Sequence, residues 1–130
     1  MKPNNGRRLV VLESPFAGEV ERNVAYAKRA LLHSLSLGEA PIASHLLWTQ
    51  PGVLDDNNPD DRRAGLAAGL AWHRAAAAVV FYVDLGVSAG MAEAEKHATR
   101  LGVPTEVRRI GVHPADGGDA ARTAAAAGDA

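Results

Sequence analysis

The spacing of apolar residues along the chain alternates between short blocks and a helical repeat. The block at 8–13 (RLVVLE) predicts a short buried strand. A helix is expected from Glu19 to a stop at Gly38. Its predicted inward stripe is Val20, Val24, Ala27, Leu31 and Leu35. A second strand candidate at 40–47 (APIASHLL) then leads into a long acidic loop at 48–61.

The second half of the chain continues the same alternation. A second helix is expected over about 60–75. The most apolar block, 77–85, predicts the best-buried strand, and it is followed by a helix at 89–101 and a last strand at 105–112. Strands that alternate with helices favour a parallel sheet with helices on both faces.

Composition divides the chain into three parts and excludes several classes of function. A single folded domain at 8–112 is expected between a flexible N-terminus (1–7) and a disordered tail rich in Ala, Gly and Asp (113–130). The formal charge of −1 offers no basic excess for a nucleic acid. Because the chain has no cysteine, it has neither a disulfide nor a thiolate zinc site.

Targeting and metal signals are also missing from the sequence. No apolar run is long enough to span a bilayer, and the N-terminus lacks the apolar segment of a signal peptide. No HxH or HExxH pattern is present. We therefore expect a cytoplasmic protein that acts without a membrane, a nucleic acid, a metal or a cofactor.

Two loops rich in small and polar residues each follow a predicted strand and precede a predicted helix. They are residues 13–18 (ESPFAG) and 84–90 (DLGVSAG). In a parallel sheet both loops emerge at the carboxyl edge, where ligands bind. They offer helix N-termini that favour anions, serine hydroxyls, and glycines beside which a ligand can approach the backbone. The predicted ligand-binding residues are Ser14, Pro15, Phe16, Gly18, Asn23, Tyr26, His45, Asp84, Gly86, Ser88, Gly90 and Met91.

Several of these residues have a structural alternative. Asp84 can accept from a ligand hydroxyl or cap the turn that follows it, and Ser88 can bind a ligand or serve as a helix N-cap. Asn23 and Tyr26 lie one turn apart on the first helix, where Tyr26 can face a ligand or the core. His45 is predicted at the end of the second strand, as a ligand-binding or acid–base group or as a structural histidine.

The predicted second helix carries small residues at helical spacing. Gly65 and Gly69 lie one turn apart. Glycines inside a helix lower its stability, so this pair predicts close packing against another backbone. The small-residue face of this helix would also suit a homodimer, in which both subunits use the same patch.

Four stretches carry a resemblance that covers about residues 8–110. They are ESPFAGEVERNVAYAKRAL (13–31), APIASHLLWTQPGVLDD (40–56), GLAAGLAWHRAA (65–76) and YVDLGVSAGMAEAEKHATRLGVP (82–104). The chain resembles the nucleoside 2-deoxyribosyltransferase-like group, and more closely a small family of uncharacterised phage and bacterial domains related to it. The resemblance implies a three-layer Rossmann- or flavodoxin-like α/β fold with a four- to five-stranded, mainly parallel sheet. It also implies a pocket for a nucleoside- or nucleotide-like small molecule.

The same resemblance bears on catalysis. In the transferases of that group, a glutamate near the start of the helix after the Asp/Gly/Ser loop attacks the anomeric carbon of the sugar. Here that position is Ala94, and Glu93 and Glu95 flank it. The replacement favours a binding module that does not turn its ligand over. The first alternative is an N-glycosidic bond hydrolase or deoxyribosyltransferase, with Glu93 or Glu95 as nucleophile and Asp84 and His45 assisting. The second is a non-catalytic interaction protein with a degenerate pocket.

Overall fold

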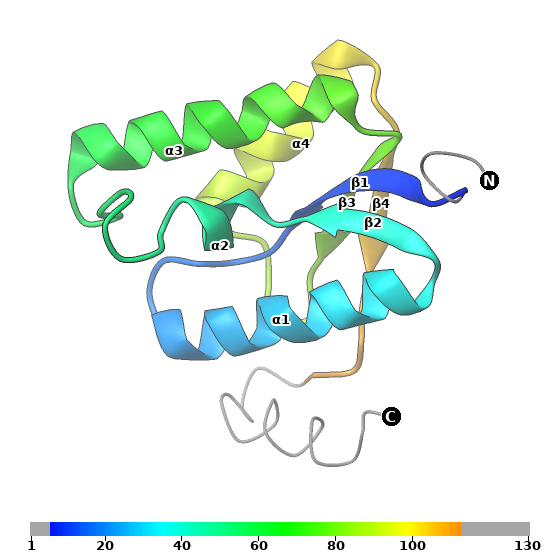
Figure 1. Ribbon diagram of the computed structural model, residues 1–130, viewed down its shortest axis with the longest axis horizontal. Helices are drawn as coiled ribbons and strands as arrows, with labels where there is room; N and C mark the ends of the chain where they lie inside the picture. The colour runs from blue at the N-terminus through cyan, green and yellow to red at the C-terminus, as the bar shows by residue number, and fades with distance from the viewer. Residues whose placement is uncertain (1–5, 113–130) are drawn as a thin grey trace.

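The computed structural model describes residues 6–112 (Figure 1). The predicted disordered tail at 113–130, and residues 1–5 of the predicted flexible N-terminus (1–7), lie outside these residues. The elements in chain order are β1 (Arg8–Glu13), α1 (Val20–Ser36), β2 (Glu39–Ile42), α2 (Ser44–Leu47), α3 (Pro59–Ala71), the 3₁₀-helix η1 (Trp72–Ala75), β3 (Ala78–Tyr82), α4 (Ala89–Leu101) and β4 (Thr105–Arg108). Within the described part of the chain, no helix is long and apolar enough to cross a membrane.

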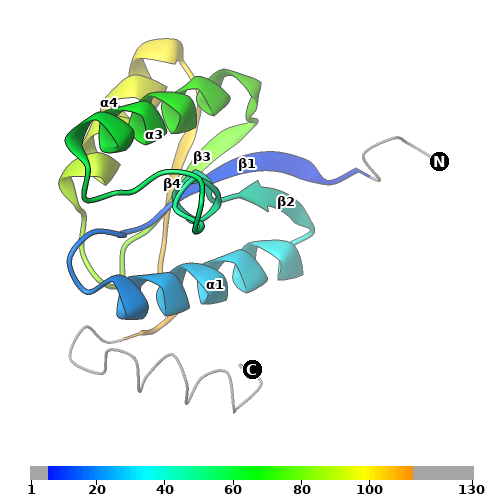
Figure 2. The same ribbon diagram turned by 60° about the vertical axis from the view of Figure 1, so that its left-hand side comes forward.

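The four strands form one parallel sheet, which confirms the predicted fold class. The strand order is β2-β1-β3-β4, and every neighbouring pair is parallel. Helix α1 covers one face, and α3 and α4 cover the other, so the fold has three layers (Figures 1 and 2). Because β1 and β3 are adjacent and parallel, the loops that follow them leave the sheet at the same edge.

The core lies in two clusters, one on each face of the sheet. The cluster on the α1 face contains Val10, Leu12, Tyr26, Ala30, Ala43, Ala78, Val80, Tyr82 and Val112. The cluster on the α4 face contains Val11, Val79, Phe81, Met91, Ala94 and Ala98. All five residues of β3 are buried, which explains its uninterrupted apolar run.

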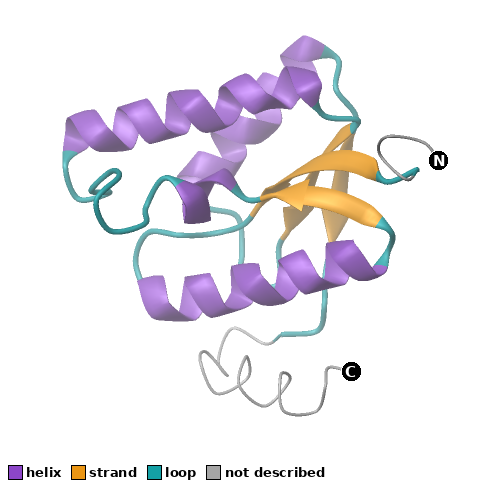
Figure 3. Cartoon of the chain, in the orientation of Figure 1, coloured by secondary structure: helices purple, strands orange, loops and turns teal. Residues whose placement is uncertain are grey.

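The second strand is shorter than the sequence pattern predicts. Strand β2 ends at Ile42, and the residues expected to continue it form the one-turn helix α2 (Figure 3). The turn is closed by a hydrogen bond from the N–H of Trp48 to the carbonyl of Ser44. The prediction of a strand over 40–47 is therefore wrong in its second half, because an apolar pattern this short fits a helical turn as well as a strand. The last strand likewise ends at Arg108 and not at residue 112.

The buried face of α1 differs from the predicted stripe. The buried residues are Asn23, Tyr26, Ala27, Ala30 and Ser34. Val20 and Leu35, which were expected to face inward, are 42% and 46% exposed. Hydrophobic periodicity misplaced this face because three polar side chains of α1 find hydrogen-bond partners in the interior.

A buried carboxylate ties three strands together on the α1 face. Glu39, at the start of β2, accepts hydrogen bonds at 2.7 and 2.8 Å from Arg108 of β4 and at 2.7 Å from Arg8 of β1. The hydroxyl of Ser34 donates to the same carboxylate at 2.8 Å. These donors, Arg108 above all, lower the pKa of Glu39 to about 2. The network joins α1, both edge strands and β1.

Candidate functional site

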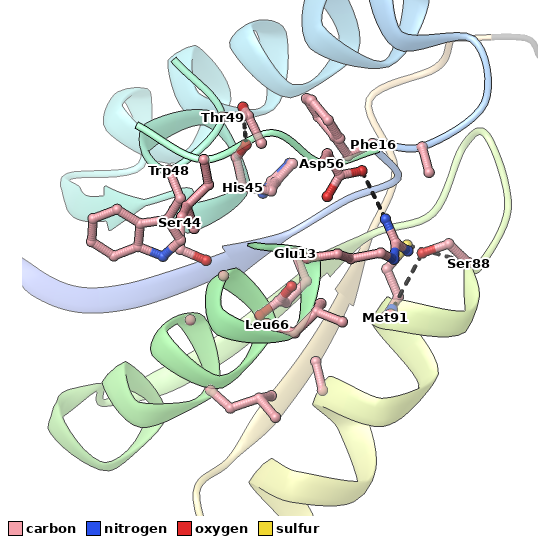
Figure 4. A pocket seen from close by; sticks show the side chains of 18 of the residues that line it. Glu13, Phe16, Ser44, His45, Trp48, Thr49, Asp56, Leu66, Ser88 and Met91 are labelled. Atoms are coloured by element: carbon pink, nitrogen blue, oxygen red, sulfur yellow. Dashed lines mark hydrogen bonds and ion pairs between the residues drawn. The ribbon is translucent and has the colours of Figure 1, made fainter. Parts of the chain in front are cut away.

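A pocket opens at the carboxyl edge of the sheet, between β1, α2, α3 and α4 (Figure 4). Its volume is about 100 Å³. Both loops that the sequence singled out contribute to it, through Ser14 and Phe16 from the first and Ser88 and Gly90 from the second. The structure therefore brings the two loops together around one cavity, as predicted.

The carboxylate of Glu13 lies in this pocket. Glu13 is the last residue of β1, and its side chain is only 15% exposed. One carboxylate oxygen lies 3.1 Å from Nε2 of His73, a fully buried histidine in η1. Glu13 begins the first of the two predicted loops, but it is not among the residues predicted to bind a ligand. The rule that selected Asp84, a carboxylate that ends a buried strand, would also have selected Glu13.

Ser14 and His45 form a hydrogen-bonded pair in the pocket wall. The hydroxyl of Ser14 lies 2.9 Å from Nε2 of His45, and the ring of Phe16 meets the imidazole edge-on at 6.1 Å. Burial lowers the pKa of His45 to about 4, so its ring is neutral at neutral pH. His45 reaches the pocket from α2, and the prediction that it ends a strand is wrong.

The N-terminus of α4 forms another wall. Ser88 is the N-cap of this helix, and its hydroxyl accepts from the N–H of Met91 at 3.2 Å. The capping alternative for Ser88 is therefore confirmed, and the residue lines the pocket as well. Gly90, Met91 and Ala94 continue the wall along the helix. The part of α4 that faces the cavity is thus small and apolar.

Helix α3 closes the pocket because it packs tightly on α2. A Cβ atom on Gly69 would lie 2.5 Å from the hydroxyl oxygen of Ser44, and one on Gly65 would lie 3.3 Å from the side chain of Leu54. The predicted close packing is therefore present, but its partners are side chains and not a second backbone. Both glycines serve contacts within the chain, so they give no argument for a homodimer.

An ion pair lies between α3 and the loop before it. Arg62 of α3 donates to Asp56 at 2.7 Å, and both residues line the pocket. Trp48 and Leu54 add apolar surface on the same side. The long acidic loop at 48–61 therefore contributes to the pocket lining.

Tyr26 and Asp84 form a separate cluster on the α1 side of the sheet. The hydroxyl of Tyr26 donates to Asp84 at 2.6 Å and accepts from its backbone N–H at 2.8 Å. The carboxylate also accepts from the N–H groups of Ile110 and Gly111. Burial alone would raise the pKa of Asp84, but these hydrogen bonds hold it below its ordinary value. The cluster does not line the pocket, and Asp84 ties the chain after β4 to the end of β3.

Four other predicted binding residues shape the loops without lining the cavity. Asn23 donates to the carbonyls of Phe16 and Ala17 at 2.9 and 3.1 Å, which holds the first loop against α1. Gly18 and Gly86 have φ angles of 98° and 99°, a left-handed backbone that favours glycine. The remaining residue of this group is Pro15, which is buried.

The carboxylates of α4 point away from the pocket. Glu93 and Glu95 are exposed, and Glu93 lies 3.7 Å from Lys96 on the helix surface. Ala94, between them, faces the cavity. Among the carboxylates that line the pocket, Asp56 is paired with Arg62, Asp61 accepts from the N–H of Asp55, and one oxygen of Glu13 contacts His73.

Comparison with known proteins assigns the chain to a protein family. The model of a family of domains of unknown function, DUF7768, matches residues 8–108. The chain belongs to this family. No curated protein and no solved structure matches the chain.

The DUF7768 match begins at the first residue of β1 and ends at the last residue of β4. It therefore spans the whole sheet and every element that lines the pocket. Within residues 6–112 of this DUF7768 domain, no group of three or more histidines and carboxylates could hold a metal ion. The acidic residues in the loop before α3 and in the first turn of α3 form local ion pairs, for example between Asp56 and Arg62 and between Asp60 and Arg63.

Proposed function

We propose that the pocket binds a nucleoside- or nucleotide-like small molecule. The observation that carries this proposal is that Glu13 contributes a carboxylate and Ser14 a hydroxyl to the lining of a pocket whose other walls are largely apolar. Small-molecule sites commonly combine apolar walls with a few polar groups that fix orientation. A nucleoside has the matching halves, since its base is flat and weakly polar and its sugar carries hydroxyls.

Each half of such a ligand has a partner in the pocket. Phe16, Trp48, Leu66 and Met91 supply apolar surface for the base. The carboxylate of Glu13 can accept from sugar hydroxyls, and hydrogen bonds to a charged acceptor are the stronger kind. The cavity also speaks against the alternative of a degenerate pocket, whose mark would be a space filled by its own side chains.

Calorimetry with matched variants tests this proposal. The probes are adenosine, guanosine, cytidine and uridine, with their 2′-deoxy and 5′-monophosphate forms. Glu13→Gln removes the pocket charge, and Glu21→Gln makes the same change on the exposed surface of α1. We expect at least one probe to bind, with an affinity reduced about 10- to 100-fold in Glu13→Gln and unchanged in Glu21→Gln. Binding that Glu13→Gln leaves intact, or no binding by any probe, would overturn the proposal.

A second candidate is cleavage of an N-glycosidic bond, which the presence of Glu13 in the pocket favours. The carboxylate would attack the anomeric carbon and form a glycosyl ester as the C–N bond breaks. The base would leave with the bonding electron pair and take up a proton, and water would then hydrolyse the ester. Chromatography of the same probes detects the released base. Release that is lost in Glu13→Gln and kept when Glu93 and Glu95 are replaced by Gln would establish this candidate, and release by none of the probes would reject it.

A further inference from the structure

Three titratable side chains form a hydrogen-bonded chain that begins at Glu13 in the pocket and ends at His97 on α4. Glu13 contacts Nε2 of His73 at 3.1 Å, and Nδ1 of His73 lies 3.1 Å from Nδ1 of His97. The two imidazole rings have centroids 5.0 Å apart and are tilted by 58°. His73 is fully buried, whereas His97, on α4, is partly exposed. The pocket is therefore linked to a histidine outside its lining by two hydrogen bonds.

The pairing of atoms restricts where the protons sit. A carboxylate only accepts, so Nε2 of His73 carries a hydrogen. Two Nδ1 atoms at 3.1 Å can bond only when one carries a hydrogen and the other does not. His73 is thus either neutral, accepting from His97, or protonated and donating to both neighbours. In both states each ring nitrogen of His73 makes a hydrogen bond, and the two states differ only in where the protons lie between Glu13 and His97.

We propose that Glu13, His73 and His97 form a proton relay between the pocket and the outer side of α4, with His73 as the residue that positions the Glu13 carboxylate. The relay rests on the proposed function, because it supplies protons to the group that would contact the ligand. A carboxylate held by histidine on one side presents its other oxygen to the pocket. Its charge then follows the proton occupancy of His97, which solvent can reach.

The transfer balances without any additional reactant. A proton from water adds to Nε2 of His97, and the Nδ1 proton of His97 passes to Nδ1 of His73. The Nε2 proton of His73 then passes to Glu13, which becomes a neutral carboxylic acid. The net result is one proton moved from solvent to the pocket, with each histidine left neutral in its other tautomer. The reverse sequence returns the proton to solvent.

The charges around the outer end of the relay favour an unprotonated resting state. Burial lowers the pKa of His97, and the positive charges of Arg100 and Arg74, together with that of His73 when it is protonated, lower it further. Arg74 comes from η1 and Arg100 from α4 itself, and Glu13 is the acidic partner, reached through His73. His97 is therefore neutral at neutral pH and able to accept a proton.

Long-range ¹H–¹⁵N spectra of the imidazole rings test the relay in the free protein, without any ligand. At about pH 8 we expect the Nε2–H tautomer for His73 and the Nδ1–H tautomer for His97. Glu13→Gln replaces the accepting carboxylate, so it should change the ¹⁵N chemical shift of Nε2 of His73, while Glu21→Gln should not. A His73 ring that carries its hydrogen on Nδ1 at this pH, or whose Nε2 signal Glu13→Gln leaves unchanged, would overturn the proposal.

A second measurement asks whether the relay acts on binding, with adenosine 5′-monophosphate as the probe. The affinity is measured between about pH 5 and 9 for the wild-type chain and for His97→Gln, with circular dichroism to confirm folding. We expect the variant to keep its affinity at the high-pH plateau and to shift the midpoint of the pH profile by about half a unit or more. An unchanged profile would refute the coupling. If the probe does not bind at all, the proposed function fails for this probe, and the ring spectra still decide the relay.

Discussion

Asp84 was expected to contact a ligand, but in the structure it joins α1 and the chain after β4 to the end of β3. The substitution Asp84→Asn tests this structural role. The wild-type carboxylate accepts from Tyr26 and from Ile110 through one oxygen, and from Gly111 through the other. Asparagine has nearly the same shape but replaces one oxygen with an NH₂ group. If the remaining oxygen keeps its two donors, the new NH₂ faces the N–H of Gly111, so two donors oppose each other.

The expected cost follows from these contacts. A hydrogen bond to a charged group contributes about 1.5–3 kcal/mol, and the substitution removes one such bond at 2.8 Å and weakens two others. We therefore expect Asp84→Asn to lower the free energy of unfolding by about 2–3 kcal/mol. Because Asp84 does not line the pocket, the affinity for any ligand that binds there should stay within about twofold of wild type while the variant is folded.

Urea denaturation followed by circular dichroism measures this difference at two pH values. The pKa of Asp84 is lower in the folded than in the unfolded state, so its contribution is present above the unfolded pKa of about 4. That contribution is lost as the pH falls through the folded pKa. The stability gap between the two proteins should therefore narrow in acid. A variant as stable as wild type, or one that stays stable but loses binding, would refute the structural role.

Three further predictions concern packing and charge. Gly69→Ala should lower the free energy of unfolding, measured by urea denaturation, by about 1–3 kcal/mol, because the new Cβ would clash with Ser44. Gly90→Ala is the control: its Cβ has no contact under 3.7 Å, so it should cause no measurable loss of stability. Glu39→Gln should lower the free energy of unfolding by about 3 kcal/mol at neutral pH, and acid titration should show the wild-type advantage fading between about pH 4.5 and 2. The pKa of His45 is lowered in the folded state, so the unfolded state takes up the proton first. Stability should then fall as the pH drops from 6.5 to about 4, with NMR showing a midpoint near 4 for this ring.

The order of elements could be predicted from the sequence because strong patterns define it. The apolar runs of β1 and β3 and the repeats of α1 and α4 are long enough to separate strand from helix. The short segment after Ile42 is not, since its few apolar residues satisfy either period. The inward face of α1 was misplaced for a different reason. Hydrophobicity does not reveal that Tyr26 and Ser34 have hydrogen-bond partners in the interior. The partner of Tyr26 is Asp84, which follows β3 and lies 58 positions away, and that of Ser34 is Glu39, the first residue of β2.

The position of the pocket could be predicted from the sequence, but the carboxylate that lines it could not. The parallel topology places both loops at one edge, and this follows from the strand order alone. Which carboxylate enters the pocket depends on the direction in which each strand end points. Glu13 faces the cavity, whereas Asp84 faces α1 and the chain after β4. The contact of Glu13 with His73 joins residues 60 positions apart, and no local pattern indicates such a pair.

Amide chemical-shift mapping shows whether the cavity beside Glu13 binds the proposed nucleoside- or nucleotide-like ligand. ¹H–¹⁵N correlation spectra are recorded while adenosine 5′-monophosphate, and then adenosine, is added to the labelled protein. We expect shifts that saturate and that concentrate on pocket-lining amides such as Ser14, His45, Gly65 and Gly90. Shifts that concentrate instead around Tyr26, on the opposite face of the sheet, or spectra that neither compound changes, would contradict it.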